Sequence, residues 1–241
     1  MILVTGGTGL VGAHLLLDLA EAGERPRAIH RRSSSFEGVK KVFSYGRSPR
    51  EAEKLFEAVE WREADTTDVQ ALSLAFEGVT TVYHCAALVS FSPSDNKKLR
   101  KINIEGTANV VNLCIKNRVE KLCYVSSIAT FDLKLGQNRI NENSFWNKEI
   151  DHSMYAISKY GAEMEVWRAS QEGIPVVIVN PGVIIGPGFW KTGSGVMFRK
   201  VWEGLKYHFP KTTGFVGVRD VIKAMRLLMD SEVKNEEFIL V

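Results

Sequence analysis

The chain has 241 residues, of which 45% are hydrophobic and 24% charged, and its formal net charge is only +3. This length can bury the core of one large domain, or of one domain with a small lobe, and the small charge gives no reason to expect nucleic acid as a partner. No apolar run approaches the ~20 residues of a membrane span, and we expect no signal peptide because the first predicted strand begins at residue 2. We therefore expect a cytoplasmic protein without a membrane partner.

Short apolar runs alternate with longer helical patterns through most of the sequence. We predict strands over Ile2–Thr5, Arg27–His30, Val59–Glu63, Thr81–His84, Lys121–Ser126 and Pro175–Asn180. We predict helices over Leu10–Ala22, Arg50–Ala58, Val69–Phe76, Asn96–Asn117, Ser153–Glu172, Ser194–Glu203 and Arg219–Met229. Residues 33–50 and 132–151 are polar and are predicted to be loops. The alternation predicts an α/β fold with a doubly wound parallel sheet and helices on both of its faces.

The first predicted strand runs directly into a glycine turn. Gly6, Gly9 and Gly12 form the pattern G-x-x-G-x-x-G, and a helix is predicted to begin at Leu10. Such a turn lets the backbone approach a pyrophosphate, and the helix N-terminus offers free N–H groups and the positive end of its dipole. The strand before and the helix after are the context that this pattern requires.

The cysteines and histidines do not indicate a metal centre. The three cysteines, Cys85, Cys114 and Cys123, form no C-x-x-C pair and lie in apolar segments, which favours buried free thiols in a reducing compartment. The five histidines at positions 14, 30, 84, 152 and 208 include no pair with metal-ligand spacing. We therefore predict no metal site.

Three polar residues could carry proton-transfer chemistry. Tyr155 and Lys159 are four residues apart, so they share one face of the predicted helix. An ammonium one turn away stabilises a phenolate, and this lowers the pKa of the phenol. Ser127 follows the fifth strand, where a hydroxyl would face the ligand crevice of a parallel sheet. The alternatives are an exposed helix pair and a turn serine.

The alternation weakens from about Gly186 onward. The aromatic residues Phe189, Trp190, Phe198, Trp202, Tyr207, Phe209 and Phe215 gather there. We expect a smaller lobe over the C-terminal edge of the sheet, with these aromatic residues forming its core in preference to contacting substrate. The apolar strand at 237–241 has no later residue to cover it. Exposed apolar edges recruit partners, so we expect either self-association, such as a homodimer, or an open substrate side.

Taken together, these residues resemble the extended short-chain dehydrogenase/reductase family from residue 1 to about residue 230. The resemblance is carried by the turn from Thr5 to Gly12, Asp65-Thr66 with Asp68, His84-Cys85-Ala86-Ala87, Asn103 with Gly106-Thr107, Tyr124-Val125-Ser126-Ser127, Tyr155-x-x-x-Lys159 and Asn180-Pro181-Gly182. The Ser-Ser-Ile sequence at 126–128 is similar to the hydroxysteroid dehydrogenase and dihydroflavonol reductase branch. The resemblance implies a Rossmann fold and a Ser-Tyr-Lys triad.

The resemblance also implies a role for each matching residue. Tyr155 would be the acid–base, Lys159 would also hold the nicotinamide ribose, and Ser127 would complete the triad. Asp65 and Thr66 would flank the adenine, Ala86 and Ala87 would line the cofactor, and Pro181, Gly182 and Val183 would face the nicotinamide. The full set of predicted cofactor-binding residues is Gly6, Thr8, Gly9, Leu10, Val11, Gly12, Arg31, Arg32, Asp65, Thr66, Ala86, Ala87, Asn103, Tyr155, Lys159, Pro181, Gly182 and Val183.

The end of the second strand bears on which dinucleotide binds. An acidic residue there would accept the ribose hydroxyls of NAD, but this chain has Arg31 and Arg32 followed by two serines. Guanidinium groups and hydroxyls suit a 2′-phosphate. We therefore predict NADP in preference to NAD, the alternative being that the two arginines are solvated surface charges.

Two features depart from the family pattern. Gly217 stands where the family has an acidic or polar residue, and the chain is shorter than extended members usually are. We therefore predict a dinucleotide-binding domain over 1–185 and a partial, apparently truncated substrate lobe over 186–241, some of which returns to the main domain.

The sequence is compatible with three functions. The first is an NADP-dependent oxidoreductase that reduces a carbonyl or oxidises a secondary alcohol on a small-molecule substrate. The second is an NAD-dependent nucleotide-sugar epimerase or dehydratase, against which Arg31 and the absent acidic residue count. The third, of another class, is a non-catalytic dinucleotide-binding module. Screening NADPH oxidation against aldehydes, ketones and nucleotide sugars separates them.

Overall fold

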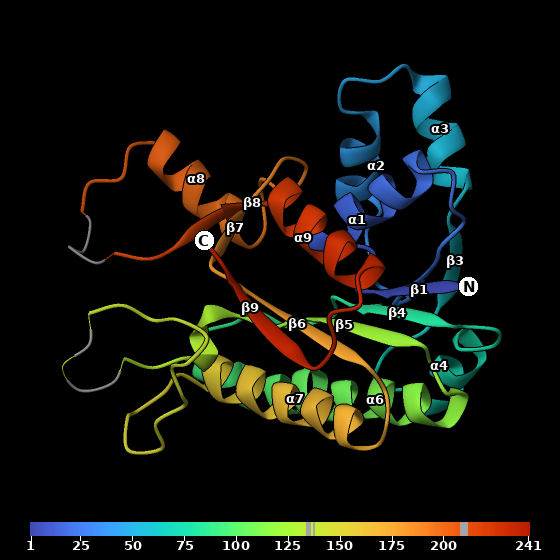
Figure 1. Cartoon of the computed structure of the whole chain (residues 1–241). Coiled ribbons are helices and arrows are strands. Elements are labelled where there is room, and N and C mark those ends of the chain that lie inside the picture. The colour runs from blue at the N-terminus through green and yellow to red at the C-terminus, as the bar shows by residue number, and fades with distance from the viewer. Residues whose placement is uncertain (134–135, 137, 208–211) are drawn as a thin grey trace.

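A large parallel sheet lies between two layers of helices in the computed structural model (Figure 1). The structure describes residues 1–133, 136, 138–207 and 212–241. The order of the seven strands in the large sheet is β3-β2-β1-β4-β5-β6-β9, and β7 pairs with β8 in a separate small sheet. The strands are β1 (Ile2–Thr5), β2 (Arg27–His30), β3 (Glu60–Glu63), β4 (Thr81–His84), β5 (Lys121–Val125), β6 (Val176–Pro181), β7 (Val183–Ile185), β8 (Phe215–Gly217) and β9 (Glu236–Leu240).

Helices cover both faces of the large sheet. The α-helices are α1 (Leu10–Glu21), α2 (Glu37–Ser44), α3 (Pro49–Glu57), α4 (Val69–Ala75), α5 (Asn96–Leu99), α6 (Gly106–Asn117), α7 (Met154–Gln171), α8 (Ser194–Trp202) and α9 (Val218–Asp230). Short 3₁₀ turns lie at η1 (Pro93–Asp95) and η3 (Ile128–Thr130), and a π-helix, η2 (Arg100–Glu105), joins α5 to α6. The predicted doubly wound sheet is confirmed, and each predicted strand lies within one residue of its expected bounds.

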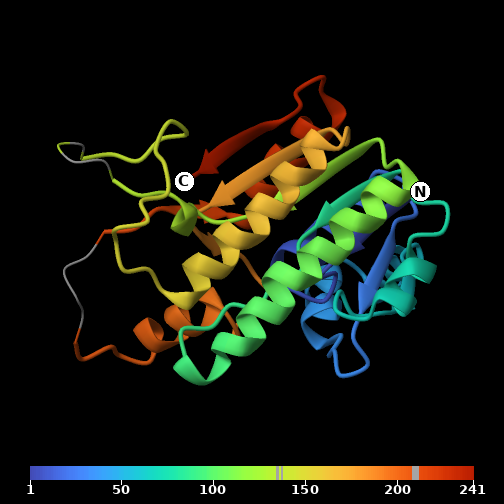
Figure 2. The same cartoon turned by 90° about the horizontal axis from the view of Figure 1, so that it is seen from below.

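The central strands β1, β4, β5 and β6 are mostly apolar because both of their faces are buried, whereas the edge strand β3 is polar and partly exposed. On β4, Val82 packs with α4, α6 and α7, whereas its neighbour Tyr83 packs on the opposite face with α1 and α9. Figure 2 shows α6 and α7 side by side across the lower face. Each fully buried large apolar side chain contributes roughly 1.5–3 kcal/mol to folding, so these two cores hold the carboxyl ends of the strands in place.

Residues 33–50 differ from the predicted loop, because α2 lies within them. Val39, Val42 and Phe43 are buried at helical spacing against α1. The next helix, α3, begins at a capping box in which Ser48 accepts from the Glu51 N–H and the Glu51 carboxylate accepts from the Ser48 N–H. The apolar triplet and the capping box are both visible in the sequence.

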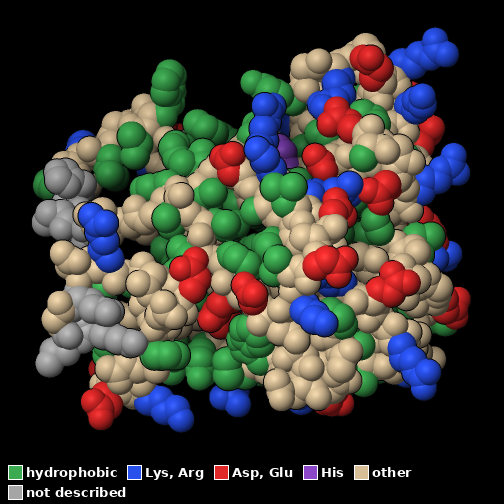
Figure 3. Space-filling view, in the orientation of Figure 1, with side chains coloured by type: hydrophobic (Ala, Val, Ile, Leu, Met, Phe, Trp, Pro, Cys, Tyr) green, Lys and Arg blue, Asp and Glu red, His purple; other side chains and the backbone are tan. Residues whose placement is uncertain are grey.

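The prediction of an aromatic lobe core is wrong for five of its members, because Trp190, Phe198, Trp202, Tyr207 and Phe215 are all exposed. Trp190, Trp202 and Tyr207 are 52%, 84% and 87% exposed, and Figure 3 shows hydrophobic side chains gathered over α8. The physical reason is size: α8 has no buried residue, and the described residues around it are too few to enclose a core of their own. Phe189 is different, because its ring packs against α2 at Gly38. His208 and Phe209 lie outside the described residues.

The last strand returns to the large sheet. β9 pairs in parallel with β6 through five residue pairs, and most of its side chains are half-buried. On its outer edge, the Ile239 N–H donates to Glu142 Oε1 at 3.0 Å. The strand at 237–241 is therefore partly covered, contrary to expectation, because residues earlier in the chain cover it. Self-association and the division near residue 185 stay predictions.

Candidate active site

A pocket of about 210 Å³ opens where the strand order turns between β1 and β4. The carboxyl ends of parallel strands diverge at such a point, and ligands of doubly wound sheets bind there. Of the residues predicted to hold a cofactor, the pocket is lined by Gly6, Thr8, Gly9, Arg31, Asp65, Thr66, Ala86 and Ala87. A larger cleft of about 530 Å³, between α1, α2 and α9, is lined by none of the predicted site residues.

The glycine turn forms a cradle that side chains would fill. Gly6 has φ +69°, and a Cβ there would lie 2.7 Å from the Ala86 nitrogen. The Gly9 N–H donates to the Gly6 carbonyl at 2.9 Å, which closes the turn before α1. Gly12 allows the first turn of α1, with Leu10 and Val11, to lie against Gly6. This cradle of bare backbone beside a helix N-terminus fits the pyrophosphate of a dinucleotide.

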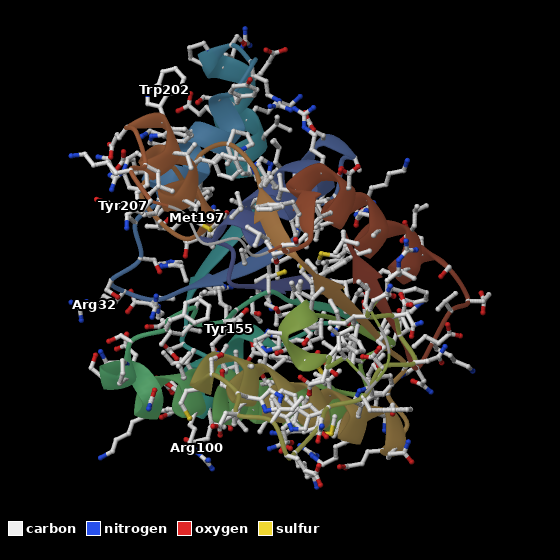
Figure 4. The ribbon with its side chains drawn as sticks, turned by 90° about the vertical axis from the view of Figure 1, so that its left-hand side faces the viewer. Arg32, Arg100, Tyr155, Met197, Trp202 and Tyr207 are labelled. Atoms are coloured by element: carbon white, nitrogen blue, oxygen red, sulfur yellow. The ribbon has the colours of Figure 1, made fainter. Side chains whose placement is uncertain are left out.

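The residues after β2 place one arginine at the pocket. Arg31 and Ser34 line it, the Ser34 hydroxyl accepts from the Arg31 N–H at 3.1 Å, and Thr8 Oγ1 donates to Ser34 Oγ at 3.4 Å. Arg32 is exposed and lies at the outer edge of the open face in Figure 4. Of the two arginines, Arg31 is therefore the one that lines the pocket.

Tyr155 and Ser127 meet in front of the sheet. Ser153 caps α7 through its hydroxyl, which accepts from the Ala156 N–H at 3.2 Å, so Tyr155 lies in the first turn of the helix. Its hydroxyl shares a hydrogen bond with Ser127, and its ring lies 5.5 Å from that of Phe91. In Figure 4, Tyr155 lies in the middle of the open face, between α8 with Met197 above and Arg100 below.

Burial raises the pKa of Tyr155, and the hydrogen bond from Ser127 opposes this rise. The sequence had suggested the opposite direction, because Lys159 lies one turn away. The physical reason is that the Lys159 ammonium is directed to β5, where it donates to Tyr124 Oη and to the Val125 carbonyl, each at 2.7 Å. Burial also lowers the pKa of Lys159 to about 7.

The remaining predicted residues lie behind or beside the pocket. Asn103 is 1% exposed, and its side chain binds the Leu88 N–H and carbonyl at 2.7 and 3.0 Å and Ser158 Oγ at 2.9 Å. Asn103 is thus placed to hold the loop after β4. Pro181 ends β6, and Gly182 and Val183 continue beside it, bonded to the Leu240 and Gly214 carbonyls.

A buried carboxylate that the sequence did not single out braces the serine loop. Glu163 Oε2 accepts from Ser126 Oγ at 2.5 Å and from Asn180 Nδ2 at 3.0 Å. Of the two serines, Ser126 is therefore bound to Glu163, and Ser127 is the one bound to Tyr155. Glu163 also interacts with Glu237 on β9, where Glu237 Oε2 is buried without a hydrogen-bond partner. Its place one turn after Lys159 on a buried helix is the only sequence signal for this role.

The Glu163–Glu237 pair predicts a pH-dependent stability. Burial and the nearby Glu163 raise the pKa of Glu237 to about 7, from an ordinary value of 4.5. A raised pKa in the folded state stabilises the fold below about pH 4.5, and this contribution is lost as the pH rises through about 7. We expect Glu237→Gln to reduce the loss of thermal stability between pH 5 and pH 8 by about 1 kcal/mol, since solvent screens this half-exposed group.

Melting temperatures at pH 5 and pH 8 measure this effect. Glu236→Gln is the control, because Glu236 is exposed on the same strand. An equal pH dependence in wild type and Glu237→Gln would contradict a raised pKa of Glu237 in the folded protein.

Within the described residues, no group of three or more histidine, cysteine, aspartate or glutamate side chains could hold a metal ion. No helix in the described part of the chain has the length and apolar character needed to cross a bilayer.

The fold and the glycine cradle agree with what comparisons with known proteins show. The model of the NAD dependent epimerase/dehydratase family matches residues 2–240. The chain therefore belongs to this family, whose members include the extended short-chain dehydrogenases/reductases.

Two curated relatives and one solved structure illustrate the similarity. A Synechocystis sp. protein named for dihydroflavonol 4-reductase is 33% identical over 220 residues, which are 90% of this chain and 60% of the relative. Tetraketide alpha-pyrone reductase 2 of Arabidopsis thaliana is 28% identical, over 95% of this chain and 73% of its own. The UDP-glucose 4-epimerase of Thermotoga maritima shares the fold, with a TM-score of 0.79, 23% identity and coverage of 99% of this chain and 76% of its own.

Proposed function

We propose that this chain is an NADP-dependent oxidoreductase that reduces a carbonyl, or oxidises a secondary alcohol, on a small-molecule substrate. The observation that carries the proposal is the meeting of Ser127 and Tyr155 through a hydrogen bond, with Lys159 one helical turn further along α7. Both curated relatives reported above are named as reductases. The chain spans only 60% of the Synechocystis relative, so the activity is proposed for the site and the substrate stays open.

The pocket suits a nicotinamide dinucleotide. The bare backbone at Gly6 and Gly9 would receive the pyrophosphate, Asp65 and Thr66 would flank the adenine, and Arg31 would meet a 2′-phosphate. Pro181, Gly182 and Val183 would face the nicotinamide. When bound, the dinucleotide supplies or accepts the hydride.

The triad residues divide the proton chemistry among themselves. A raised pKa keeps Tyr155 protonated at neutral pH, so its phenol can donate a proton to the oxygen of a carbonyl substrate. Ser127 would hold that oxygen beside Tyr155. The phenolate that results is stabilised by the hydrogen bond from Ser127. Lys159, whose ammonium is directed to β5, would hold the nicotinamide ribose.

The dinucleotide preference gives a direct test. We expect wild type to bind NADPH more tightly than NADH, and we expect Arg31→Asp to weaken NADPH binding about 10- to 150-fold, because a charge-assisted contact is replaced by repulsion. Fluorescence titration with both dinucleotides measures this. Arg32→Asp is the matched control and should lose less, because Arg32 does not line the pocket. Equal or tighter NADH binding by wild type would refute the NADP assignment.

Turnover is tested by a screen of NADPH oxidation against aldehydes, ketones and nucleotide sugars. Oxidation with a ketone or aldehyde is the expected result. Conversion of a nucleotide sugar with no net change in the dinucleotide would instead identify an epimerase, and no turnover with tight dinucleotide binding would identify a non-catalytic module.

A further inference from the structure

The ammonium of Lys159 is fastened to β5 by two hydrogen bonds. Lys159 is 1% exposed, and its Nζ donates to Tyr124 Oη and to the Val125 carbonyl. An ammonium has three N–H donors, so one N–H of Lys159 is left to bind a ligand. Removing the Tyr124 hydroxyl would leave a second buried donor unpaired, which is costly in a water-free interior.

From Tyr124, a series of buried side chains extends further, each in contact with the next. The Tyr124 hydroxyl bonds to Thr107, Thr107 Oγ1 lies 2.9 Å from His84 Nε2, and His84 Nδ1 lies 2.6 Å from Thr5 Oγ1. All of these residues are 2% exposed or less. The His84 and Tyr124 rings also stack, because these two residues are partners across β4 and β5.

This series of side chains ends at the dinucleotide cradle. Thr5 Oγ1 accepts from the Ala86 N–H at 3.2 Å, and Ala86 lines the pocket next to Gly6. Four side chains thus connect Lys159, on the triad helix, with the turn proposed to hold the pyrophosphate.

The direction of the hydrogen bonds depends on the charge of Lys159. Burial lowers the pKa of His84 to about 3, so its ring is neutral and carries one N–H. While the Lys159 ammonium donates to Tyr124, the Tyr124 O–H donates onward to Thr107, the Thr107 O–H donates to His84 Nε2, and the His84 proton lies on Nδ1. A neutral Lys159 can accept the Tyr124 proton instead, which allows the series of hydrogen bonds to reverse and the His84 proton to lie on Nε2.

We propose that Tyr124 is a positioning residue for Lys159, and that through Thr107 and His84 it couples the charge of Lys159 to the dinucleotide turn. The functional part of this inference rests on the proposed role of Lys159 in binding and catalysis. The coupling itself is a property of the folded chain and can be measured without any ligand.

The groups that face Lys159 place its titration in an accessible range. Burial lowers its pKa to about 7, while Glu163 on the same helix and Cys85 after β4 act to raise it. Cys85 is itself buried, with its pKa raised to about 12, and burial raises the pKa of Tyr124 on β5 and of Tyr155 on α7. These three groups stay neutral around pH 7. Glu163 is the acidic partner of Lys159, although burial raises the pKa of Glu163 as well.

The first test is nitrogen NMR of ¹⁵N-histidine-labelled protein without ligand, from pH 5.5 to pH 9. The His84 signals are identified by their loss in His84→Gln. We expect the two His84 ring nitrogens to exchange intensity or shift near pH 7, although His84 itself does not become charged. Tyr124→Phe and Thr107→Val should both abolish this step, because each breaks the series of hydrogen bonds at a different link.

Tyr83→Phe is the matched control. Tyr83 is also buried and precedes His84, but its ring packs on the opposite face of the sheet, with α1 and α9. The control should keep the step. A wild-type His84 that shows no step near pH 7, or a step that survives in Tyr124→Phe, would overturn the proposal.

The second test is the pH dependence of NADPH affinity. In wild type, affinity should fall as Lys159 loses its charge near pH 7. In Tyr124→Phe this midpoint should move down by about one pH unit, because a hydrogen bond to the charged form is lost, so binding weakens more at pH 7 than at pH 5.5. An unchanged midpoint would refute the positioning role. Absence of any dinucleotide binding by wild type would refute the proposed function and would leave the NMR result to decide the coupling.

Discussion

Tyr155→Phe should lower turnover about 10²- to 10⁴-fold while leaving the fold and dinucleotide binding intact. The substitution removes the hydroxyl that meets Ser127 and keeps the ring that packs against Phe91. The proton donor is lost, so a carbonyl oxygen would have to take its proton from water. The measurement is kcat with whichever carbonyl substrate the NADPH screen identifies, together with NADPH titration of the same variant.

Tyr160→Phe is the control for this experiment. Tyr160 lies on the same helix, and its ring stacks on that of Trp146 at 4.5 Å between ring centroids. It should retain the wild-type rate. Wild-type turnover by Tyr155→Phe would show that the triad is not the catalytic group, whatever the identity of the substrate.

Gly6→Ala should destabilise the protein by about 2–5 kcal/mol and abolish dinucleotide binding. Two separate effects contribute. The backbone at Gly6 has φ +69°, which costs an L-residue about 1–2 kcal/mol. Its Cβ would also lie 2.7 Å from the Ala86 nitrogen, and backbone on both sides would have to shift, which costs about 1–3 kcal/mol. Denaturant unfolding and NADPH titration measure the two consequences.

Gly23→Ala separates these effects. Gly23 has a similar backbone, φ +83°, but no atom lies within 4 Å of the position that its Cβ would take. It should lose only about 1 kcal/mol and should bind NADPH as wild type does. If Gly6→Ala lost no more stability than Gly23→Ala and still bound the dinucleotide, the close approach of the turn to Ala86 would have no functional importance.

The sequence predicts the sheet well because the positions that are buried in the sheet are the positions that carry hydrophobic residues. Strands such as β6 are buried on both faces and so begin with a continuous apolar run, and the glycine turn has a local geometric cause. Helix α2 was missed because glycine and serine around it outweighed the spacing of Val39, Val42 and Phe43.

The site is less visible in the sequence than the fold is. The spacing of Tyr155 and Lys159 is local and can be read directly, but the direction in which Lys159 points depends on Tyr124, which lies 35 residues earlier in the chain. In the sequence, Glu163 looks like any charged residue of a helix. Only the structure shows that it is buried and accepts a hydrogen bond from Asn180. The aromatic residues of 190–207 suggested a core because composition indicates apolar character and cannot indicate which side chains are buried in the fold.

The position of β1 also has a consequence for how the protein folds. β1 is the first strand of the chain, yet it lies in the interior of the sheet between β2 and β4, and the bond from Thr5 to His84 joins residues 79 positions apart. The dinucleotide cradle cannot assemble as a local hairpin could, because its two sides meet only after a long loop has closed. Chains dominated by such distant contacts fold slowly. The cradle should therefore gain protection from hydrogen exchange late in refolding, together with β4, and not with the helix that begins immediately after it.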